Sequence, residues 1–368
     1  MVDKPLFLLS ASLITISIIF SYSLSSFAIL YYDYNEFHFM LRQLIAGILG
    51  ILLMWGISRC NPDDFILKLG FFLFFGGIVI MFIMHFLPES LATSAGGAKR
   101  WIRLPFFSLA PVEFFKIGFI VFLAWSFSRK FSLIETKSLK EEFITFLPYA
   151  FVFLIAVYLI AILQNDLGQI VLLGATLALM MIFAGSSFKL FVNLLAIAFV
   201  LFISVIITSA HRITRIKAWW AGTQDMILSF FPQSIANSLR IENLPEPYQI
   251  QHSLNAISNG GIFGEGLGNG LIKLGFLSEV HTDVILAGIT EEIGFIGLFC
   301  ISLLFYLFCS GAGIILGFSF LINAFGISGL IPIKGIAVPF LSYGGSSILA
   351  SSILVGMVLS ISKRAKMS

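Results

Sequence analysis

Long runs of apolar residues, separated by short polar stretches, follow one another along most of the chain. A helix needs about 20 apolar residues to cross a bilayer, because the hydrocarbon core is about 30 Å thick and each residue rises about 1.5 Å. This measure predicts about ten spans and an all-α integral membrane protein. The predicted spans lie near residues 6–30, 37–57, 67–87, 111–128, 146–163, 167–184, 188–208, 282–308, 312–331 and 339–361.

The composition supports this interpretation. Hydrophobic residues make up 58% of the chain and charged residues 11%, which is more apolar surface than a soluble fold of 368 residues buries in one core. The 41 Phe residues are spread along the whole length, so residues 1–368 are expected to form a single polytopic domain. The first span lacks a small-residue cleavage site and is expected to remain as a helix. Any activity must then come from loops and helix ends.

Basic residues in short loops indicate which side of the membrane each loop faces, since cytoplasmic loops carry an excess of Lys and Arg. The residues assigned in this way to the cytoplasmic side are Lys4, Arg59, Lys68, Arg129, Lys130, Lys137, Lys140, Lys189, Lys363, Arg364 and Lys366. Both termini are therefore expected in the cytoplasm. The net charge of +3 is too small to suggest a nucleic-acid partner.

A second set of basic residues falls on the opposite, outer side, against the usual bias. This set comprises Lys99, Arg100, Arg103, Arg212, Arg215, Lys217, Lys273 and Lys334. A long outer loop can carry such charges without any function, because the rule holds only for short loops. The compact run 99–103 is not explained in this way and favours a functional reason for cations on the outer side.

The longest polar stretch, residues 209–281, forms an extracytoplasmic loop between the predicted spans 7 and 8. It is too rich in aromatic residues for a free linker, and its portion 251–257 has a helical pattern that breaks at 259–261. We expect it to lie on or dip into the outer leaflet. Its glycines at 264, 266, 268 and 270 indicate tight turns, since no strand precedes them as a nucleotide-binding motif requires.

Few acidic residues lie at positions where they could carry chemistry. Asp283 stands at the start of the eighth span, where either a helix cap or a catalytic group would place an Asp. Glu291 and Glu292 follow two turns later in the same helix. Helical geometry turns Glu292 to the side opposite Asp283, so Glu291 is the better candidate for lining the same cavity.

Other polar positions have a structural and a functional interpretation. Glu113 and Lys116 are three residues apart, so they form either a packing ion pair or part of a cavity. Lys334 stands at the outer end of a span, where its side chain could also reach the headgroups. The small polar residues 342–347 are typical of close helix packing. No cysteine spacing predicts a metal site.

Several segments, in this order and over nearly the whole chain, resemble the SEDS family of bacterial cell-envelope proteins. The segments are residues 97–102 (GAKRWI), 111–116 (PVEFFK), 165–168 (NDLG), 264–268 (GEGLG), 281–283 (HTD), 291–294 (EEIG) and 339–347 (PFLSYGGSS). Residues 333–335, with the Pro-Phe and double-Ser form that follows, resemble the division branch of the family rather than the elongation branch.

This resemblance implies a ten-span peptidoglycan glycosyltransferase of the bacterial plasma membrane, acting at the division septum. Such an enzyme polymerises lipid II on the outer face with a class B penicillin-binding protein, the transpeptidase, and other divisome proteins. A sugar hydroxyl must lose a proton as it attacks, and Asp283 is the expected general base. The leaving lipid pyrophosphate needs no acid, so cations suffice. The candidates to bind it are Arg100, Arg103, Arg212, Arg215 and Lys334.

The remaining expectations are less specific. Glu113, Lys116, Glu291 and His281 are expected to be cavity-lining or structural polar residues. No protein metal site is expected, while a divalent cation, Mg²⁺ or Mn²⁺, at the pyrophosphates is left open. A lipid II flippase and a non-catalytic scaffold are the alternative functions. Residues 293–333 carry no charge where the family has a basic loop, so either a tight turn at 310–313 joins two spans or residues are missing.

Overall fold

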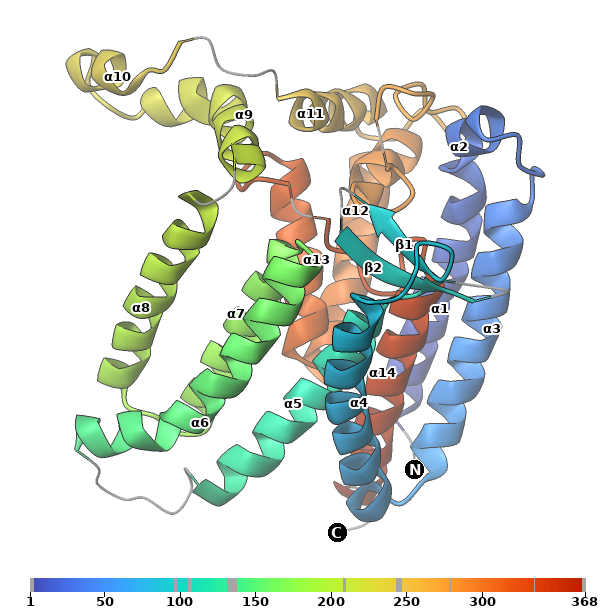
Figure 1. Cartoon of the computed structure of the whole chain (residues 1–368). Helices are drawn as coiled ribbons and strands as arrows, with labels where there is room; N and C mark the ends of the chain where they lie inside the picture. Colours follow the sequence, from blue (N-terminus) through green and yellow to red (C-terminus); the bar gives the residue numbers. More distant parts are fainter. Residues whose placement is uncertain are drawn as a thin grey trace.

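The computed structural model describes residues 3–95, 98–104, 108–130, 138–207, 210–242, 247–277, 279–333 and 335–365, and it is mainly helical (Figure 1). Its first half contains α1 (Lys4–Ser23), α2 (Ser26–Tyr31), α3 (His38–Arg59), α4 (Pro62–Met84), α5 (Pro111–Lys130), α6 (Leu139–Val157) and the π-helix η1 (Tyr158–Leu163). Its second half contains α7 (Leu167–Phe183), α8 (Phe188–Ile207), α9 (Ala210–Leu228), α10 (Gln233–Leu239), α11 (Tyr248–Gly260), α12 (Ile285–Ala312), α13 (Ile314–Ile327) and α14 (Gly345–Ala365).

The predicted spans correspond to helices. Seven helices of the described chain are long and apolar enough to cross a membrane, namely α1, α3, α4, α5, α6 with η1, α12 and α14. Three shorter apolar helices, α7, α8 and α13, lie where the remaining spans were predicted. Both ends of the chain lie at the same end of the bundle (Figure 1). The boundaries differ by several residues: the fifth helix begins at Leu139 rather than at 146, and the last begins at Gly345 rather than at 339.

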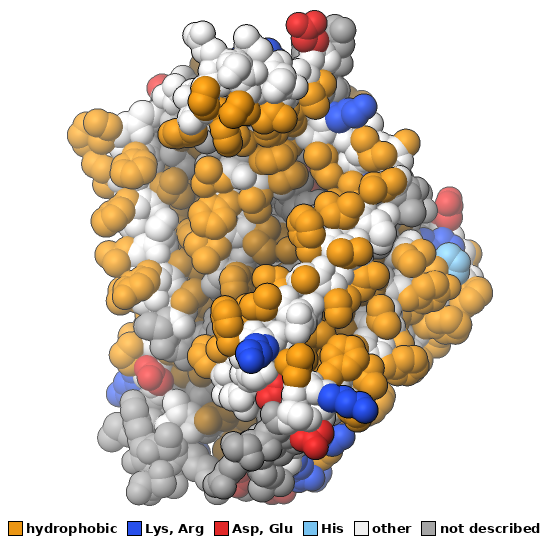
Figure 2. Space-filling model, turned by 90° about the vertical axis from the view of Figure 1, so that its left-hand side faces the viewer, with side chains coloured by type: hydrophobic (Ala, Val, Ile, Leu, Met, Phe, Trp, Pro, Cys, Tyr) orange, Lys and Arg blue, Asp and Glu red, His pale blue; other side chains and the backbone are white. Residues whose placement is uncertain are grey.

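Glycines allow the central helices to pack closely. A Cβ at Gly118 of α5 would lie 2.2 Å from the backbone N of Phe74 in α4, and one at Gly50 of α3 would lie 2.6 Å from Ser352 Oγ in α14. Small residues let helix backbones approach in a membrane, where burial of apolar surface gives no driving force between helices. On the face that Figure 2 shows, apolar side chains cover most of the middle, and most of the charged ones lie toward the two ends.

A small sheet lies at the outer end of the bundle and was not predicted from the sequence. Strands β1 (Ala92–Ala95), β2 (Ala98–Arg103) and β3 (Ser108–Leu109) pair antiparallel in the order β1-β2-β3. The strands are only four, six and two residues long. Such short segments give no clear alternation of polar and apolar residues. The sheet fixes the position of the basic run 99–103.

The long outer segment folds into helices that lie across the outer end of the bundle (Figure 1). These are α9, α10 and α11, and α11 ends at Gly260, as the break at 259–261 predicted. Trp219 of α9 donates its indole N–H to the carbonyl of Gly329 beyond α13, at 2.8 Å. The segment is therefore fastened to the bundle.

Helix α12 is broken at Gly294, which has a φ of 68° and a ψ of −174°. The backbone beyond α11 pairs with α12 at this break. Glu265 N and Gly266 N donate to the carbonyls of Glu291 and Glu292, and Phe295 N and Ile296 N donate to those of Gly261 and Ile262. A Cβ at Gly264 would lie 2.3 Å from the Glu292 carbonyl oxygen. Only glycine fits this backbone joint.

The connection between α12 and α13 is a single residue, Gly313, with a φ of 105°. The tight turn expected within the uncharged interval is confirmed. A left-handed backbone conformation of this kind favours glycine.

Candidate active site

Asp283 lies in a turn that leads into α12 from the outer side. Its backbone N–H and that of Thr282 donate to the carbonyl of Glu279, which has a φ of 57°. The N-cap of α12 is Val284, with no side-chain hydrogen bond. The interpretation of Asp283 as a helix cap is therefore wrong, because the helix begins one residue too late for its carboxylate to reach the free N–H groups. Within the described residues, no group donates a hydrogen bond to this carboxylate.

Three long-range hydrogen bonds hold the Asp283 turn in place. Asn323 of α13 donates to the carbonyl of Asp283 at 2.6 Å and to that of Ile336 at 2.9 Å. Ser342 donates from its hydroxyl to the carbonyl of Thr282 at 2.7 Å, and Tyr343 N donates to the carbonyl of His281 at 2.9 Å. Residues far apart in sequence thus fix the backbone on either side of the carboxylate.

Two side chains of the bundle core support the 341–344 segment in turn. Gln43 of α3 donates to the carbonyl of Ser342 at 3.2 Å and accepts from Gly344 N at 3.1 Å. Ser17 of α1 donates to the carbonyl of Leu341 at 2.8 Å. These residues, like Asn323, were missed by the sequence interpretation, since nothing in their local sequence indicates a partner far away in the chain.

Four charged groups act on the Asp283 carboxylate. Burial raises its pKa to about 6, with further increases from the negative charges of Glu279 and Asp166, while Arg215 and Arg100 oppose the increase. Removal from water disfavours the charged form of a carboxyl group. A Cβ at Gly335 would lie 2.8 Å from Asp283 Oδ2, so the absence of a side chain there leaves room for the carboxylate.

Two of the predicted arginines, Arg100 and Arg212, both bind the junction of η1 and α7. Arg100 in β2 donates to the carbonyls of Gln164 and Asn165, both at 2.8 Å. Arg212 in α9 donates to the carbonyl of Ala161 and to Asn165 Oδ1, both at 3.0 Å. The sheet and an outer helix thus place two cations on one segment.

The remaining predicted cations are not bonded to the η1–α7 junction in the described part of the chain. Arg215 lies near enough to Asp283 to influence its pKa. Arg103 ends β2, where its backbone N–H donates to the carbonyl of Leu91 at 2.8 Å and its side chain is exposed. Lys334 lies outside the described residues.

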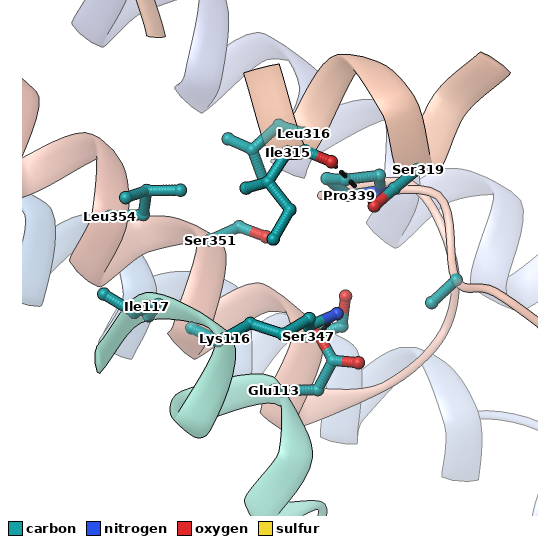
Figure 3. Close-up of a pocket in the computed structure, with 12 residues that line it drawn as sticks. Glu113, Lys116, Ile117, Ile315, Leu316, Ser319, Pro339, Ser347, Ser351 and Leu354 are labelled. Carbon is teal, nitrogen blue, oxygen red and sulfur yellow. Dashed lines mark hydrogen bonds and ion pairs between the residues drawn. The ribbon is translucent and has the colours of Figure 1, made fainter. Parts of the chain in front are cut away.

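Glu113 and Lys116 form an ion pair of 2.8 Å on α5. Gln169 of α7 donates to the second oxygen of Glu113 at 3.3 Å. The pair lines a small pocket between α5, α13 and α14, where it faces Ser347 (Figure 3). Both interpretations from the sequence therefore apply, because the residues are paired and also line a pocket.

Glu291 and Glu292 are each bonded through Oε1, while their Oε2 atoms are buried without a hydrogen-bond partner among the described residues. Glu291 Oε1 accepts from Asn259 Nδ2 at 3.0 Å and from the backbone N–H groups of Leu271 and Ile272 at 2.8 Å. Glu292 pairs with Lys273 at 2.5 Å, and both side chains are buried. Glu291 thus anchors the glycine-rich segment. Of the two interpretations from the sequence, cavity-lining or structural, this contact corresponds to the structural one.

His281 packs among aromatic rings, with its ring centroid 5.2 Å from that of Phe39 and 5.7 Å from that of Tyr343. Burial lowers the pKa of its imidazole, and the negative charge of Glu279 opposes this decrease. A neutral ring in an aromatic cluster serves the packing of the turn.

Comparisons with known proteins show what the chain is similar to. The FtsW, RodA and SpoVE model, described as "Cell cycle protein", matches residues 4–314 and 304–367. The chain is 52% identical over 384 aligned positions to the "Probable peptidoglycan glycosyltransferase FtsW" of Helicobacter pylori J99, covering 99% of both chains. A protein of the same name from Trichlorobacter lovleyi is 33% identical, over 100% of this chain and 94% of the relative.

The family match breaks into two pieces that overlap at residues 304–314, at the α12–α13 junction. The alignment to the Helicobacter pylori relative is also longer than the chain of 368 residues. Both findings agree with a connection that is shorter here than in relatives.

Two solved structures share the fold. A chain titled "Structural coordination of polymerization and crosslinking by a peptidoglycan synthase complex" superposes with a TM-score of 0.69 at 20% identity, over 100% of this chain and 99% of the other. Thermus thermophilus RodA gives a TM-score of 0.62 at 20% identity, over 99% and 97%. The match to the family model and the sequence identity to the relatives show that the chain belongs to the FtsW/RodA/SpoVE family of cell cycle proteins.

Proposed function

We propose that this peptidoglycan glycosyltransferase polymerises lipid II on the outer face of the plasma membrane during cell division, with Asp283 as its general base. The name of the relatives, at 52% identity over the full length, supports the reaction class and the division role. One observation carries the role of Asp283: its carboxylate accepts no hydrogen bond from the described residues, although Arg100 and Arg215 lie near enough to act on its pKa.

The reaction joins two lipid-linked sugars. The oxygen of a sugar hydroxyl on one lipid II attacks the anomeric carbon of another, and Asp283 accepts the hydroxyl proton. The bond from that carbon to the pyrophosphate breaks, and undecaprenyl pyrophosphate leaves as an anion. Because this anion is stable, no second carboxylic acid is needed to protonate it.

The outer cations stabilise the two pyrophosphates. Arg100, Arg103, Arg212, Arg215 and Lys334 are the proposed ligands. Arg can bind two phosphate oxygens at once through its planar guanidinium. Arg100 and Arg212 already hold the η1–α7 junction with some of their N–H groups, so their guanidinium groups are oriented before substrate arrives.

A divalent cation, Mg²⁺ or Mn²⁺, is a further part of the proposal. It would share the pyrophosphate charge with the arginines. The described residues contain no group of three or more His, Cys, Asp or Glu that could hold a metal ion, so substrate oxygens would have to complete its coordination. Polymerisation in the presence and absence of EDTA tests this part.

We also propose a class B penicillin-binding protein as partner, both termini in the cytoplasm, and a location at the septum. The partner is supported by the matching chain from a peptidoglycan synthase complex, and the septum by the name FtsW of the relatives. The shared position of the chain ends supports a common side for the termini (Figure 1).

The test is polymerisation of labelled lipid II by the purified protein with its transpeptidase partner in detergent. We expect glycan strands from the wild type and none from Asp283→Ala. Asp225→Ala, which removes an exposed carboxylate on α9, is the matched control and should retain activity. Equal polymer from Asp283→Ala would exclude the assigned base. Absence of polymer from the wild type would favour a flippase, and complementation of a depleted strain by Asp283→Ala would favour a scaffold.

A further inference from the structure

A series of aromatic rings in contact leads from the Asp283 turn to α2 at the outer end of the bundle (Figure 1). We call it the aromatic ladder, and it consists in order of His281 with Tyr343, then Phe39, Tyr34, Tyr32 and Tyr31. At its inner end, the ring centroid of Phe39 lies 5.2 Å from that of His281 and 5.1 Å from that of Tyr343. The ladder therefore starts at the backbone that carries the proposed base.

The rings become more exposed with distance from the Asp283 turn. Phe39 is 8% exposed, Tyr34 44%, Tyr32 64% and Tyr31 69%. The ring centroids are 5.8 Å apart for Phe39 and Tyr34, 6.0 Å for Tyr34 and Tyr32, and 4.9 Å for Tyr32 and Tyr31. Because rings at these separations are in contact, the three tyrosines form one surface rather than three separate side chains.

The loop that carries the outer rings is fixed to the segment before α12 at two points. Phe39 packs against His281, and Phe27 of α2 lies over Gly275, where a Cβ would be 2.9 Å from Phe27 Cε2. The loop backbone is also bonded internally, since Tyr34 N donates to the carbonyl of Ile29 at 3.0 Å. Side chains that are held in place before binding lose less conformational entropy when a ligand arrives.

The charges of this loop differ from those around the η1–α7 junction, where Arg100 and Arg212 lie. Residues 24–41 contain two acids, Asp33 and Glu36, and no Lys or Arg. Both acids are exposed. Such a surface does not attract a pyrophosphate or an anionic headgroup. Aromatic rings near helix ends often lie among headgroups, but these rings continue inward to the turn of the proposed base.

We propose that the aromatic ladder binds sugar rings of the growing glycan strand as the strand leaves the site. The inference rests on the proposed function, the polymerisation of lipid II. The C–H groups on one face of a sugar ring carry partial positive charge and stack on the negative face of an aromatic ring, and a tyrosine adds a hydroxyl that hydrogen-bonds the sugar. The ladder retains the strand between additions, so more bonds form before the strand dissociates.

The first experiment measures strand length. The wild type, Tyr31→Ser/Tyr32→Ser, Tyr31→Phe/Tyr32→Phe and the control Phe230→Ser polymerise labelled lipid II with the partner protein present. Serine removes the rings and should shorten the mean strand about two- to tenfold, while the initial rate of bond formation stays within about twofold because Asp283 is unchanged. Phenylalanine keeps the rings and should keep most of the length. Phe230 is 82% exposed between α9 and α10, outside the ladder, and its loss should not shorten the strand.

A second measurement needs no variant. Tetranitromethane nitrates exposed tyrosines, and mass spectrometry reads the modification at each position. With the wild type and its partner in nanodiscs, peptide-free glycan strands should slow the nitration of Tyr31 and Tyr32 about two- to tenfold. Nitration of Tyr306, which is 71% exposed on α12, should not change.

Unchanged strand length in the serine variant would overturn the inference, and so would nitration that glycan strands do not slow, because the rings would then contact headgroups instead. A serine variant that loses initial rate and strand length together would also overturn it, since the rings would then serve the Asp283 turn. Failure of the proposed function is a separate outcome, in which the wild type makes no polymer.

Discussion

Asp283 and the pair Glu291–Glu292 belong to one segment of the chain, about two helical turns apart, yet their surroundings are opposite. Glu291 accepts three hydrogen bonds and Glu292 is paired with the buried Lys273. The Asp283 carboxylate receives no hydrogen bond from the described residues. A buried carboxylate that is hydrogen-bonded or ion-paired, even through one oxygen, is held in the fold, whereas one without partners costs stability and stays available to accept a proton.

The largest expected effect is on activity at the unpartnered carboxylate. Asp283→Asn should lower the polymerisation rate by about 10²- to 10⁴-fold. Folding raises the pKa of this carboxyl to about 6, so the contribution of its protonated form to stability is lost as the pH rises through that value. The ionised group then costs the fold roughly 3 kcal/mol at neutral pH.

Asp283→Asn should therefore unfold at the same or a higher temperature than the wild type. Thermal unfolding in detergent checks this. A clearly lower unfolding temperature would mean that the carboxylate has a structural partner, and the contrast with Glu291 and Glu292 would be lost.

The second prediction concerns the buried pair. Lys273→Met leaves Glu292 charged and buried without its cation, which should cost about 3–5 kcal/mol of unfolding free energy. Adding Glu292→Met should recover part of this loss, since an apolar pair leaves no charge behind. Equilibrium unfolding of both variants measures the difference. If Lys273→Met alone were as stable as the wild type, the pair would not hold α12 to the glycine-rich segment.

Glu291→Gln should have a smaller effect. The amide oxygen of Gln can still accept from the backbone, but the charge that strengthens the three bonds is lost, at a cost of about 1–2 kcal/mol. The rate per folded molecule should be unchanged, because Glu291 serves the fold alone. Activity normalised to folded protein is the measurement. A large loss at full stability would assign Glu291 to the reaction instead.

The smallest effect is the pH dependence of the wild type. Asp283 can accept a proton only when ionised, so the rate should rise from acid pH to a plateau with a midpoint at about 6. A midpoint near the ordinary Asp value would show that burial and the neighbouring charges do not act on the base, and the comparison with the bonded glutamates would have no electrostatic basis.

The sequence predicted the fold well because a span needs only a local run of apolar residues. It also predicted the helix that became α11, since Asn259 followed by two glycines favours the end of a helix. The small sheet was missed because its strands are too short to show a pattern.

The site could be predicted only in part. Asp283 and Arg100 lie in the family motifs, and the other arginines were candidates because they lie on the outer side. The cap interpretation was wrong, because the start of α12 depends on a turn fixed by Asn323 of α13 and by Ser342 before α14. Asn323 and Gln43 act on backbone atoms 40 and 301 residues away.

The joint at Gly294 has a consequence for how freely the outer segment can vary. Four main-chain hydrogen bonds connect residues 261–266 to α12, so the connection does not depend on which side chains these residues carry. Gly264 and Gly294 are fixed because any Cβ there would collide with the opposing backbone, and Gly261 and Gly266 are constrained by their positive φ. The outer helices and the helix that follows Asp283 can thus stay joined while the surface of the segment changes to suit different partners.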